Sequence, residues 1–77
     1  MDNKNLSLEG LIFEAIELSV ENNIMCITLN RPEKKNAINP VMANEIIYSL
    51  AFAAQERDIR VVVIKANGDV FCAGGDL

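Results

Sequence analysis

Two adjacent glycines, Gly74 and Gly75, are the residues of this sequence best suited to take part in chemistry through their backbone. They lie in residues 70–77 (VFCAGGDL), which follow an apolar run and an Asn-Gly-Asp turn. Glycine has no Cβ, so its main-chain N–H can approach a bound group closely and stabilise a developing oxyanion. A tight turn without a ligand is the alternative, since glycine is common in turns. We call residues 67–77 the glycine loop.

A second candidate segment, residues 30–39, is locally positive in a chain whose formal net charge is −4. It contains Arg31, Lys34 and Lys35 against a single acidic residue, Glu33. This basic loop is either a solvated lysine-rich segment or a binding site for a phosphate-bearing ligand. A position of the basic loop next to the glycine loop would favour the binding site over the solvated segment.

The composition argues against several kinds of site. The 77-residue chain has no histidine, so it offers neither a Ser-His triad nor a histidine metal ligand. Cys26 and Cys72 lie far apart without CxxC spacing, which disfavours zinc and thioredoxin-type sites. No G-x-G-x-x-G or P-loop motif is present, and the acidic charge disfavours nucleic-acid binding. We expect no metal site and no tightly bound cofactor.

The same sequence predicts a cytoplasmic protein. Residues 1–5 are polar, and the apolar stretch from Leu11 is interrupted by Glu14 and Glu17, so neither a signal peptide nor a membrane span fits. Two free thiols without an export signal suit a reducing compartment. Half of the residues (51%) are hydrophobic, which is high for a lone small chain and favours a fragment of a longer protein.

The elements that position the two loops begin with a predicted hairpin. Residues 12–20 approach an alternation of apolar and polar side chains, and residues 24–29 form a more apolar run. The pair Asn22 and Asn23 between them predicts a tight turn, because asparagine tolerates the left-handed conformation. Pro32 ends the second strand. Residues 1–11 are predicted to be a loose N-terminal arm.

A helix and a third strand complete the prediction. Asn39 as N-cap and Pro40 in the first turn predict a helix over residues 41–57. Its packed stripe is predicted to comprise Met42, Ile46, Ile47, Leu50 and Ala54. The unalternating apolar run within residues 61–65 predicts a parallel strand covered on both faces. The fold class is therefore α/β, a hairpin followed by a βαβ unit with an expected right-handed crossover.

This topology places both candidate loops at one end of the sheet. The basic loop follows the strand at 24–29, and the glycine loop follows the strand at 61–65. Because the carboxyl ends of parallel strands share one edge of a sheet, the two loops together form one candidate site.

The residues also resemble those of a known family, the crotonase or enoyl-CoA hydratase/isomerase superfamily. Residues 27–32 (ITLNRP) with 36–39 (NAIN) are similar to its first sequence block, and 60–64 (RVVVI) with 71–77 (FCAGGDL) to its second. Each block is moderately specific, and both in order around a helix of suitable length are highly specific. The resemblance implies that residues 12–77 are the incomplete N-terminal ββα-β part of a crotonase-like (ClpP/crotonase) domain.

The resemblance further implies an enzyme of fatty acid metabolism that acts on an acyl-CoA thioester, with coenzyme A as part of the substrate. In the family, the residue matching Gly75 donates one of two backbone N–H groups that hold the thioester oxygen as it gains enolate charge. Family members assemble as trimers or pairs of trimers. Residues along the CoA and acyl path match Lys34, Lys35, Ala37, Ala73, Gly75, Asp76 and Leu77.

The resemblance also suggests what these residues do. Lys34 and Lys35 are expected near the phosphates or adenosine of CoA, whereas Ala37 and Ala73 offer small side chains or backbone contacts. Leu77 is expected to begin the wall of the acyl pocket.

Two polar side chains of the glycine loop need separate interpretation. Asp76 is either a catalytic acid or, as we favour, a loop residue whose carboxylate accepts backbone N–H bonds. Cys72 is interpreted as a small packed side chain and not a nucleophile, because no neighbour in the sequence would activate its thiol.

The second oxyanion donor and the acid/base carboxylates of the family lie beyond position 77, so the reaction cannot be assigned and this chain alone is expected to be inactive. Hydratase or isomerase is the default expectation. The thioester carrier is CoA or an acyl-carrier protein. A non-catalytic CoA-binding or protein-interaction module is the alternative, and an unrelated α/β domain with a structural Gly-Gly turn is a third interpretation.

Overall fold

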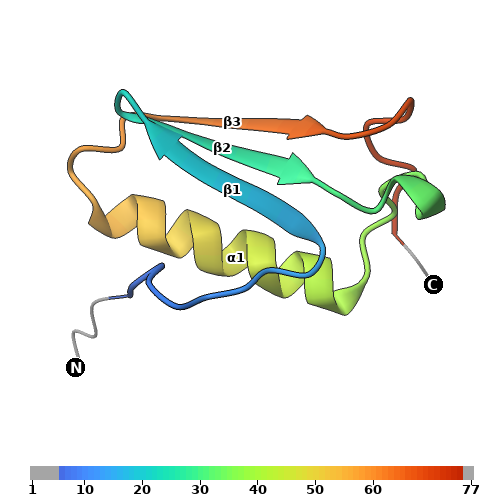
Figure 1. Cartoon of the computed structure of the whole chain (residues 1–77), viewed down its shortest axis with the longest axis horizontal. Helices are drawn as coiled ribbons and strands as arrows, with labels where there is room; N and C mark the ends of the chain where they lie inside the picture. The colour runs from blue at the N-terminus through green and yellow to red at the C-terminus, as the bar shows by residue number, and fades with distance from the viewer. Residues whose placement is uncertain (1–5, 76–77) are drawn as a thin grey trace.

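The computed structural model describes residues 6–75 as a three-stranded sheet with one long helix packed against it (Figure 1). The strands are β1 (Ile16–Glu21), β2 (Ile24–Leu29) and β3 (Val61–Ala66), in the order β1-β2-β3. A 3-10 helix, η1 (Pro32–Lys34), and the helix α1 (Pro40–Gln55) lie between β2 and β3. The α/β architecture predicted from the sequence is confirmed.

The hairpin forms because its turn is encoded locally. Asn22 and Asn23 both have left-handed φ angles, 52° and 69°, as a two-residue turn of matching twist requires. Glu21 therefore pairs with Ile24, and Ile16 pairs with Leu29 at the other end of the antiparallel ladder. The first strand is shorter than the alternation from residue 12 predicted.

The N-terminus of α1 also forms as predicted. Asn39 has an extended conformation, and its Oδ1 accepts the N–H of Met42 at 2.9 Å. Pro40 occupies the first helical turn, where the absence of an N–H donor costs no hydrogen bond. After α1, β3 pairs in parallel with β2, so that Leu29 lies opposite Ala66 where both strands end. The segment β2-α1-β3 is thus a βαβ unit.

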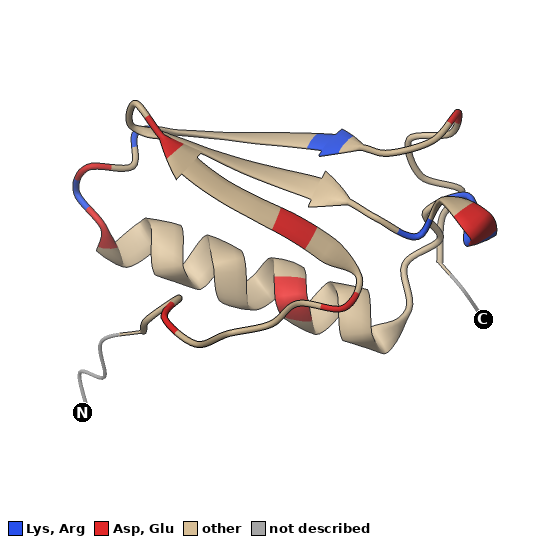
Figure 2. Cartoon of the chain, viewed as in Figure 1, with Lys and Arg blue, Asp and Glu red and all other residues tan. Residues whose placement is uncertain are grey.

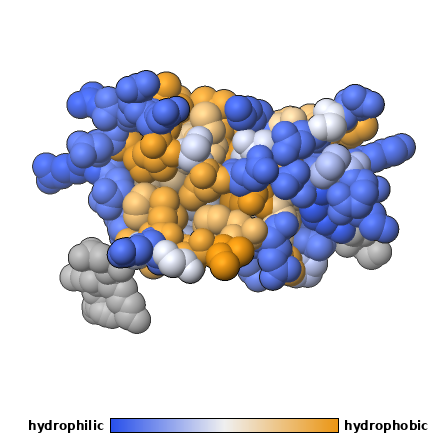
Figure 3. All heavy atoms as spheres, viewed as in Figure 1, coloured by the Kyte–Doolittle hydropathy of each residue, from blue (hydrophilic) through white to orange (hydrophobic). Residues whose placement is uncertain are grey.

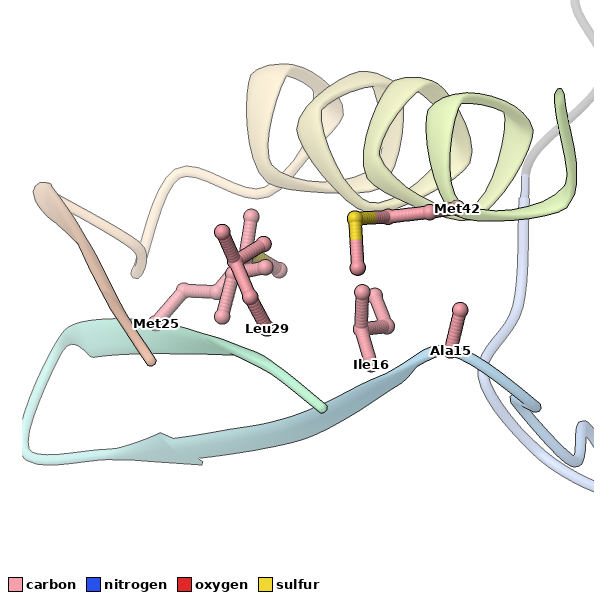
Figure 4. Packing of buried hydrophobic residues seen from close by; sticks show 6 residues of the cluster. Ala15, Ile16, Met25, Leu29 and Met42 are labelled. Atoms are coloured by element: carbon pink, nitrogen blue, oxygen red, sulfur yellow. The ribbon is translucent and has the colours of Figure 1, made fainter. Parts of the chain in front are cut away.

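The hydrophobic core lies between α1 and the inner face of β1 and β2. Figure 4 shows the end of the Met42 side chain of α1 turned toward Ile16, the first residue of β1, with Ala15 beside it, and Met25 and Leu29 lie further along the same layer. All of these side chains are at most 3% exposed.

The predicted packed stripe of α1 is wrong in part. Ile47 and Leu50 are 63% and 41% exposed, whereas Ser49 is fully buried and its Oγ donates to the Glu45 carbonyl. Phe52 and Ala53 also pack against the core. Nearly every side of this helix carries an apolar residue, so the spacing alone did not select the face that meets the sheet.

The strand β3 also differs from its prediction. Its pattern suggested cover on both faces, but Val61 and Ile64 are 51% and 43% exposed within this chain. Only Val62 and Ala66 of β3 pack against the core cluster. The β3 side chains are exposed because β3 lies at the edge of the sheet, whereas α1 packs over β1 and β2.

The segment before β1 runs along α1 (Figure 1) and is bonded to it by side chains of the helix. The Gln55 amide exchanges two hydrogen bonds with the backbone of Leu6, and the Glu45 carboxylate accepts the N–H groups of Glu14 and Ala15 at 2.6 and 2.7 Å. The division at residue 11 into arm and domain stays a prediction. Within residues 6–75, no helix is long and apolar enough to cross a membrane.

Candidate functional site

The two candidate loops lie side by side at the end of the sheet where β2 and β3 finish. Figure 1 shows η1 and the segment after β3 next to each other at this end, opposite the β1–β2 hairpin. Two backbone hydrogen bonds join them: the N–H of Ala73 donates to the Lys35 carbonyl at 3.0 Å, and the N–H of Ile38 donates to the Gly74 carbonyl at 2.8 Å. The prediction that the loops share one location is confirmed.

The bond between Ile38 and Gly74 determines the direction of the next N–H group. The peptide joining Gly74 to Gly75 is planar and trans, so its carbonyl and its N–H point in opposite directions. Because the Gly74 carbonyl points at Ile38, the Gly75 N–H points away from the basic loop. Among residues 6–75, no recorded hydrogen bond uses this N–H.

The neighbouring amide is engaged, which leaves Gly75 as the available donor of the pair. The N–H of Gly74 donates to the Cys72 Sγ at 3.4 Å, and Cys72 packs partly against the core. Gly74 itself has a φ of 106°, a conformation that glycine adopts without strain. A Cβ built on Gly75 would meet no atom of residues 6–75 within 4 Å, so the described part of the chain leaves space beside this residue. The geometry suits hydrogen bonding to an oxygen atom of a ligand.

The basic loop owes its shape to a tight reversal after β2. The N–H groups of Lys34 and Lys35 donate to the carbonyls of Arg31 and Pro32, both at 3.0 Å, and form η1. Lys35 then has a left-handed φ of 53°. Both lysine side chains are exposed, whereas the half-buried Arg31 donates from Nη1 to the Ala37 carbonyl.

The charge distribution at this end is mixed. Figure 2 shows basic residues on and beside η1 with an acidic residue among them, and another acidic residue lies at the tip of the glycine loop. Hydrophilic residues cover this end in the space-filling view, whereas apolar residues gather over the centre (Figure 3). The ammonium groups of the two exposed lysines lie at the rim of the site.

Asn36, which the sequence analysis did not select as a site residue, lies between the loops and is fully buried. Its Oδ1 accepts the Arg31 N–H at 2.7 Å, and its Nδ2 donates to the carbonyls of Asn67 and Val70 at 2.7 and 2.8 Å. An asparagine in a loop usually indicates a turn, so the pattern contained no sign of this burial.

The structure brings together most of the residues predicted for the site. Lys35 is bonded to Ala73, and Gly75 pairs with Ile38, whereas Lys34 and Ala37 lie next to Lys35 and Ile38 in the basic loop. Asp76 and Leu77 lie outside the described residues. The roles assigned to all seven stay predictions.

The described part of the site is an open surface. Residues 6–75 enclose no pocket, and no three of their Cys, Asp or Glu side chains gather as ligands for a metal ion. Such a surface can contribute backbone donors and cationic side chains to a ligand. It holds no enclosed volume for an acyl chain.

Comparison with known proteins identifies the family. The family model described as enoyl-CoA hydratase/isomerase matches residues 19–77, which include both candidate loops. The chain belongs to the enoyl-CoA hydratase/isomerase family.

Relatives and solved structures agree with this assignment. The chain is 38% identical over 65 residues to a trans-2-decenoyl-[acyl-carrier-protein] isomerase of Streptococcus mutans and 42% identical over 65 residues to the human enoyl-CoA delta isomerase 2. Each match covers 84% of this chain. A crystal structure of an enoyl-CoA hydratase/isomerase from Mycobacterium paratuberculosis superposes with a TM-score of 0.83 at 32% identity, over 86% of this chain.

The chain spans only part of these proteins. It covers 25% of the Streptococcus mutans isomerase, 16% of the human isomerase and 26% of the mycobacterial structure. This enoyl-CoA hydratase/isomerase chain therefore corresponds to one segment of its relatives.

Proposed function

We propose that this chain supplies part of the active site of an enzyme that acts on an enoyl thioester, as a hydratase or an isomerase. The observation that carries the proposal is the Gly75 N–H, which the bond between Ile38 and the Gly74 carbonyl turns away from the basic loop. An amide held in this way is oriented before a ligand arrives. Donation to the thioester oxygen stabilises the charge that develops as an enolate forms.

The proposed roles of the remaining residues follow from their match to the family's sequence blocks. Lys34 and Lys35 bind phosphates of the thioester carrier with their exposed ammonium groups, and Ala37 and Ala73 line the path beside the loops. Asp76 holds the glycine loop, and Leu77 begins the acyl pocket wall.

The chemistry needs further groups. Proton transfer at Cα and Cβ of the acyl group requires a general acid and base, and these, with a second oxyanion donor, are proposed to lie outside residues 1–77. Both oxygens of Glu45 accept backbone N–H groups, so this carboxylate has a structural task. We accordingly infer that the 77 residues alone have no turnover. The complete enzyme is proposed to be cytoplasmic and to form trimers or hexamers, with no cofactor besides the coenzyme A of its substrate.

The substrate class is suggested by the relatives. Two of them are named as isomerases of enoyl thioesters, one on an acyl-carrier protein and one on CoA, and others are named as enoyl-CoA hydratases. Both carriers end in the same phosphopantetheine thioester. We therefore propose an enoyl thioester with either carrier.

The test is to remove the donor and to compare the result with a variant that keeps it. Gly75→Pro removes the N–H, and Gly75→Ala keeps it while adding a methyl group where the described residues leave open space. In the protein produced from its complete coding sequence, hydration of crotonyl-CoA and double-bond migration in a 3-enoyl-CoA are measured. We expect Gly75→Pro to lower kcat by about 10²–10³-fold and Gly75→Ala by far less, because loss of one oxyanion donor has that effect.

The outcome also separates the enzyme from the alternative function. Exposed apolar side chains of Ile24 and Val61 lie at one end of the β2–β3 pair and favour an interaction module. If the wild-type protein binds CoA but turns over neither substrate, the non-catalytic module is supported. Equal kcat values for Gly75→Pro and wild type would refute the oxyanion role.

A further inference from the structure

Asn36 is unusual among the polar residues of this chain because its whole side chain is buried inside a loop. It is 0% exposed, and both its amide oxygen and its amide nitrogen are used in hydrogen bonds. Its φ of 55° lies in the left-handed region, which asparagine tolerates better than most residues. A loop residue with all of these properties is held by its partners on several sides.

The partners of Asn36 lie in its own basic loop and at two positions of the glycine loop. Its Oδ1 accepts from Arg31 just after β2, and its Nδ2 donates to Asn67 just after β3 and to Val70 within the glycine loop. These partners are 5, 31 and 34 residues away in sequence. Removing the side chain would leave one N–H and two carbonyl groups without this partner, in a place where the side chain excludes water.

The two backbone bonds between the loops flank Asn36 on either side. Lys35 accepts from Ala73, and Ile38 donates to the Gly74 carbonyl. The side-chain bonds of Asn36 hold the root of the glycine loop at residues 67 and 70. The backbone bonds hold its far end at residues 73 and 74. The direction of the Gly75 N–H depends on the bond at Gly74, so it also depends on the loop being held at its root.

We propose that Asn36 is a positioning residue for the oxyanion donor. Its side chain anchors the glycine loop against the basic loop, keeps the Gly74 carbonyl on Ile38 and thereby sets the direction of the Gly75 N–H. Asn36 does not touch the substrate. Its relevance to catalysis rests on the proposed function, whereas its effect on the loop does not.

The substitution that isolates this role is Asn36→Gly, since glycine adopts the left-handed φ at no steric cost. The side-chain hydrogen bonds and the packing of the buried amide are then lost, while the left-handed backbone stays accessible. Asn36→Asp keeps the shape but turns a carboxylate oxygen toward the carbonyls of Asn67 and Val70, where an amide donor is required.

The matched control is Asn23→Gly at the opposite end of the sheet. Asn23 also has a left-handed φ, 69°, and its Nδ2 also donates to a distant carbonyl, that of Asp58, at 2.7 Å. This variant loses one side-chain hydrogen bond of an exposed residue, whereas Asn36→Gly loses three at a buried one. It shows the effect of losing a left-handed asparagine that touches neither loop.

The first measurement is steady-state kinetics of the protein produced from its complete coding sequence. We expect Asn36→Gly to lower kcat by about 10²-fold with KM changed by less than about threefold, because a small displacement of a catalytic donor has a large effect on rate. Asn36→Asp should be at least as impaired. If Asn36→Gly lowers kcat no more than Asn23→Gly does, the positioning role is overturned.

The second measurement needs no turnover. Hydrogen exchange of the Ile38 and Ala73 amides should be at least about tenfold faster in Asn36→Gly than in wild type, because exchange reports local opening. The amides of the β2–β3 ladder in the same sample are the internal reference. Asn23→Gly should leave the exchange of the Ile38 and Ala73 amides unchanged. Unchanged exchange in Asn36→Gly would overturn the proposal. Faster exchange in a protein whose wild type has no enoyl-thioester activity would support the anchoring role and refute the proposed function.

Discussion

Replacement of Gly68 by alanine tests how closely the glycine loop must approach the basic loop. Gly68 has a φ of 90°, and a Cβ added there would lie 2.9 Å from the Pro32 Cβ and 3.6 Å from its Cα. The proline ring cannot rotate away from this contact, so one of the two loops must shift. The left-handed backbone adds a cost of about 1–2 kcal/mol for a residue with a side chain.

The two effects together give the expected magnitude. Overpacking at a tight contact typically costs about 1–3 kcal/mol, so Gly68→Ala is expected to lower the free energy of unfolding by about 2–5 kcal/mol in total. Gly10→Ala is the control, because Gly10 has a φ of 77° but its Cβ would meet nothing within 4 Å. That variant carries the backbone cost alone and should lose about 1–2 kcal/mol.

The assay is denaturant-induced unfolding of the protein from its complete coding sequence, followed by far-ultraviolet circular dichroism, for wild type and both variants. The difference between the two variants measures the contact with Pro32. If Gly68→Ala and Gly10→Ala are equally destabilised, no steric contact exists at Gly68. The close approach of the loops described above would then be incorrect.

Two further predictions concern the rim of the site and the segment before β1. Replacing both Lys34 and Lys35 by alanine should weaken binding of CoA with little change in kcat. The loss of affinity should be smaller at high ionic strength, because exposed charges are screened by salt. An unchanged dissociation constant measured by calorimetry would contradict a phosphate-binding role. Glu45→Gln keeps the shape of the side chain but removes the charge that faces the N–H groups of Glu14 and Ala15. The substitution should lower the free energy of unfolding by about 1–2 kcal/mol, since hydrogen bonds to charged groups are the stronger ones. An unchanged stability in thermal unfolding would argue that Glu45 does not anchor this segment.

The elements predicted correctly are those whose causes are local. Asn22 and Asn23 adopt the left-handed turn that their side chains tolerate, and Asn39 with Pro40 begins α1 as their types require. In both cases the residues that determine the structure lie within a few positions of one another. The end of β2 before Pro32 has the same kind of cause.

The packed face of α1 required the tertiary structure. Ile47 and Leu50 are as hydrophobic as the residues that face the sheet, yet they are exposed while Ser49 is buried. The helix could satisfy its periodicity with several orientations. Its orientation is determined by where the connections to β2 and β3 place it over the sheet.

The sequence by itself determined the left-handed turn at Asn22 and Asn23, the start of the helix, the order of the strands and the two loops that meet at one end of the sheet. Only the tertiary structure decided that Asn36 is buried against the glycine loop and that the Gly75 N–H points away from the basic loop. The reason is that both features depend on partners far away in sequence, Asn67 and Val70 for the first and Ile38 for the second. A hydrogen bond across such a separation forms only when the whole βαβ unit has brought the two loops together.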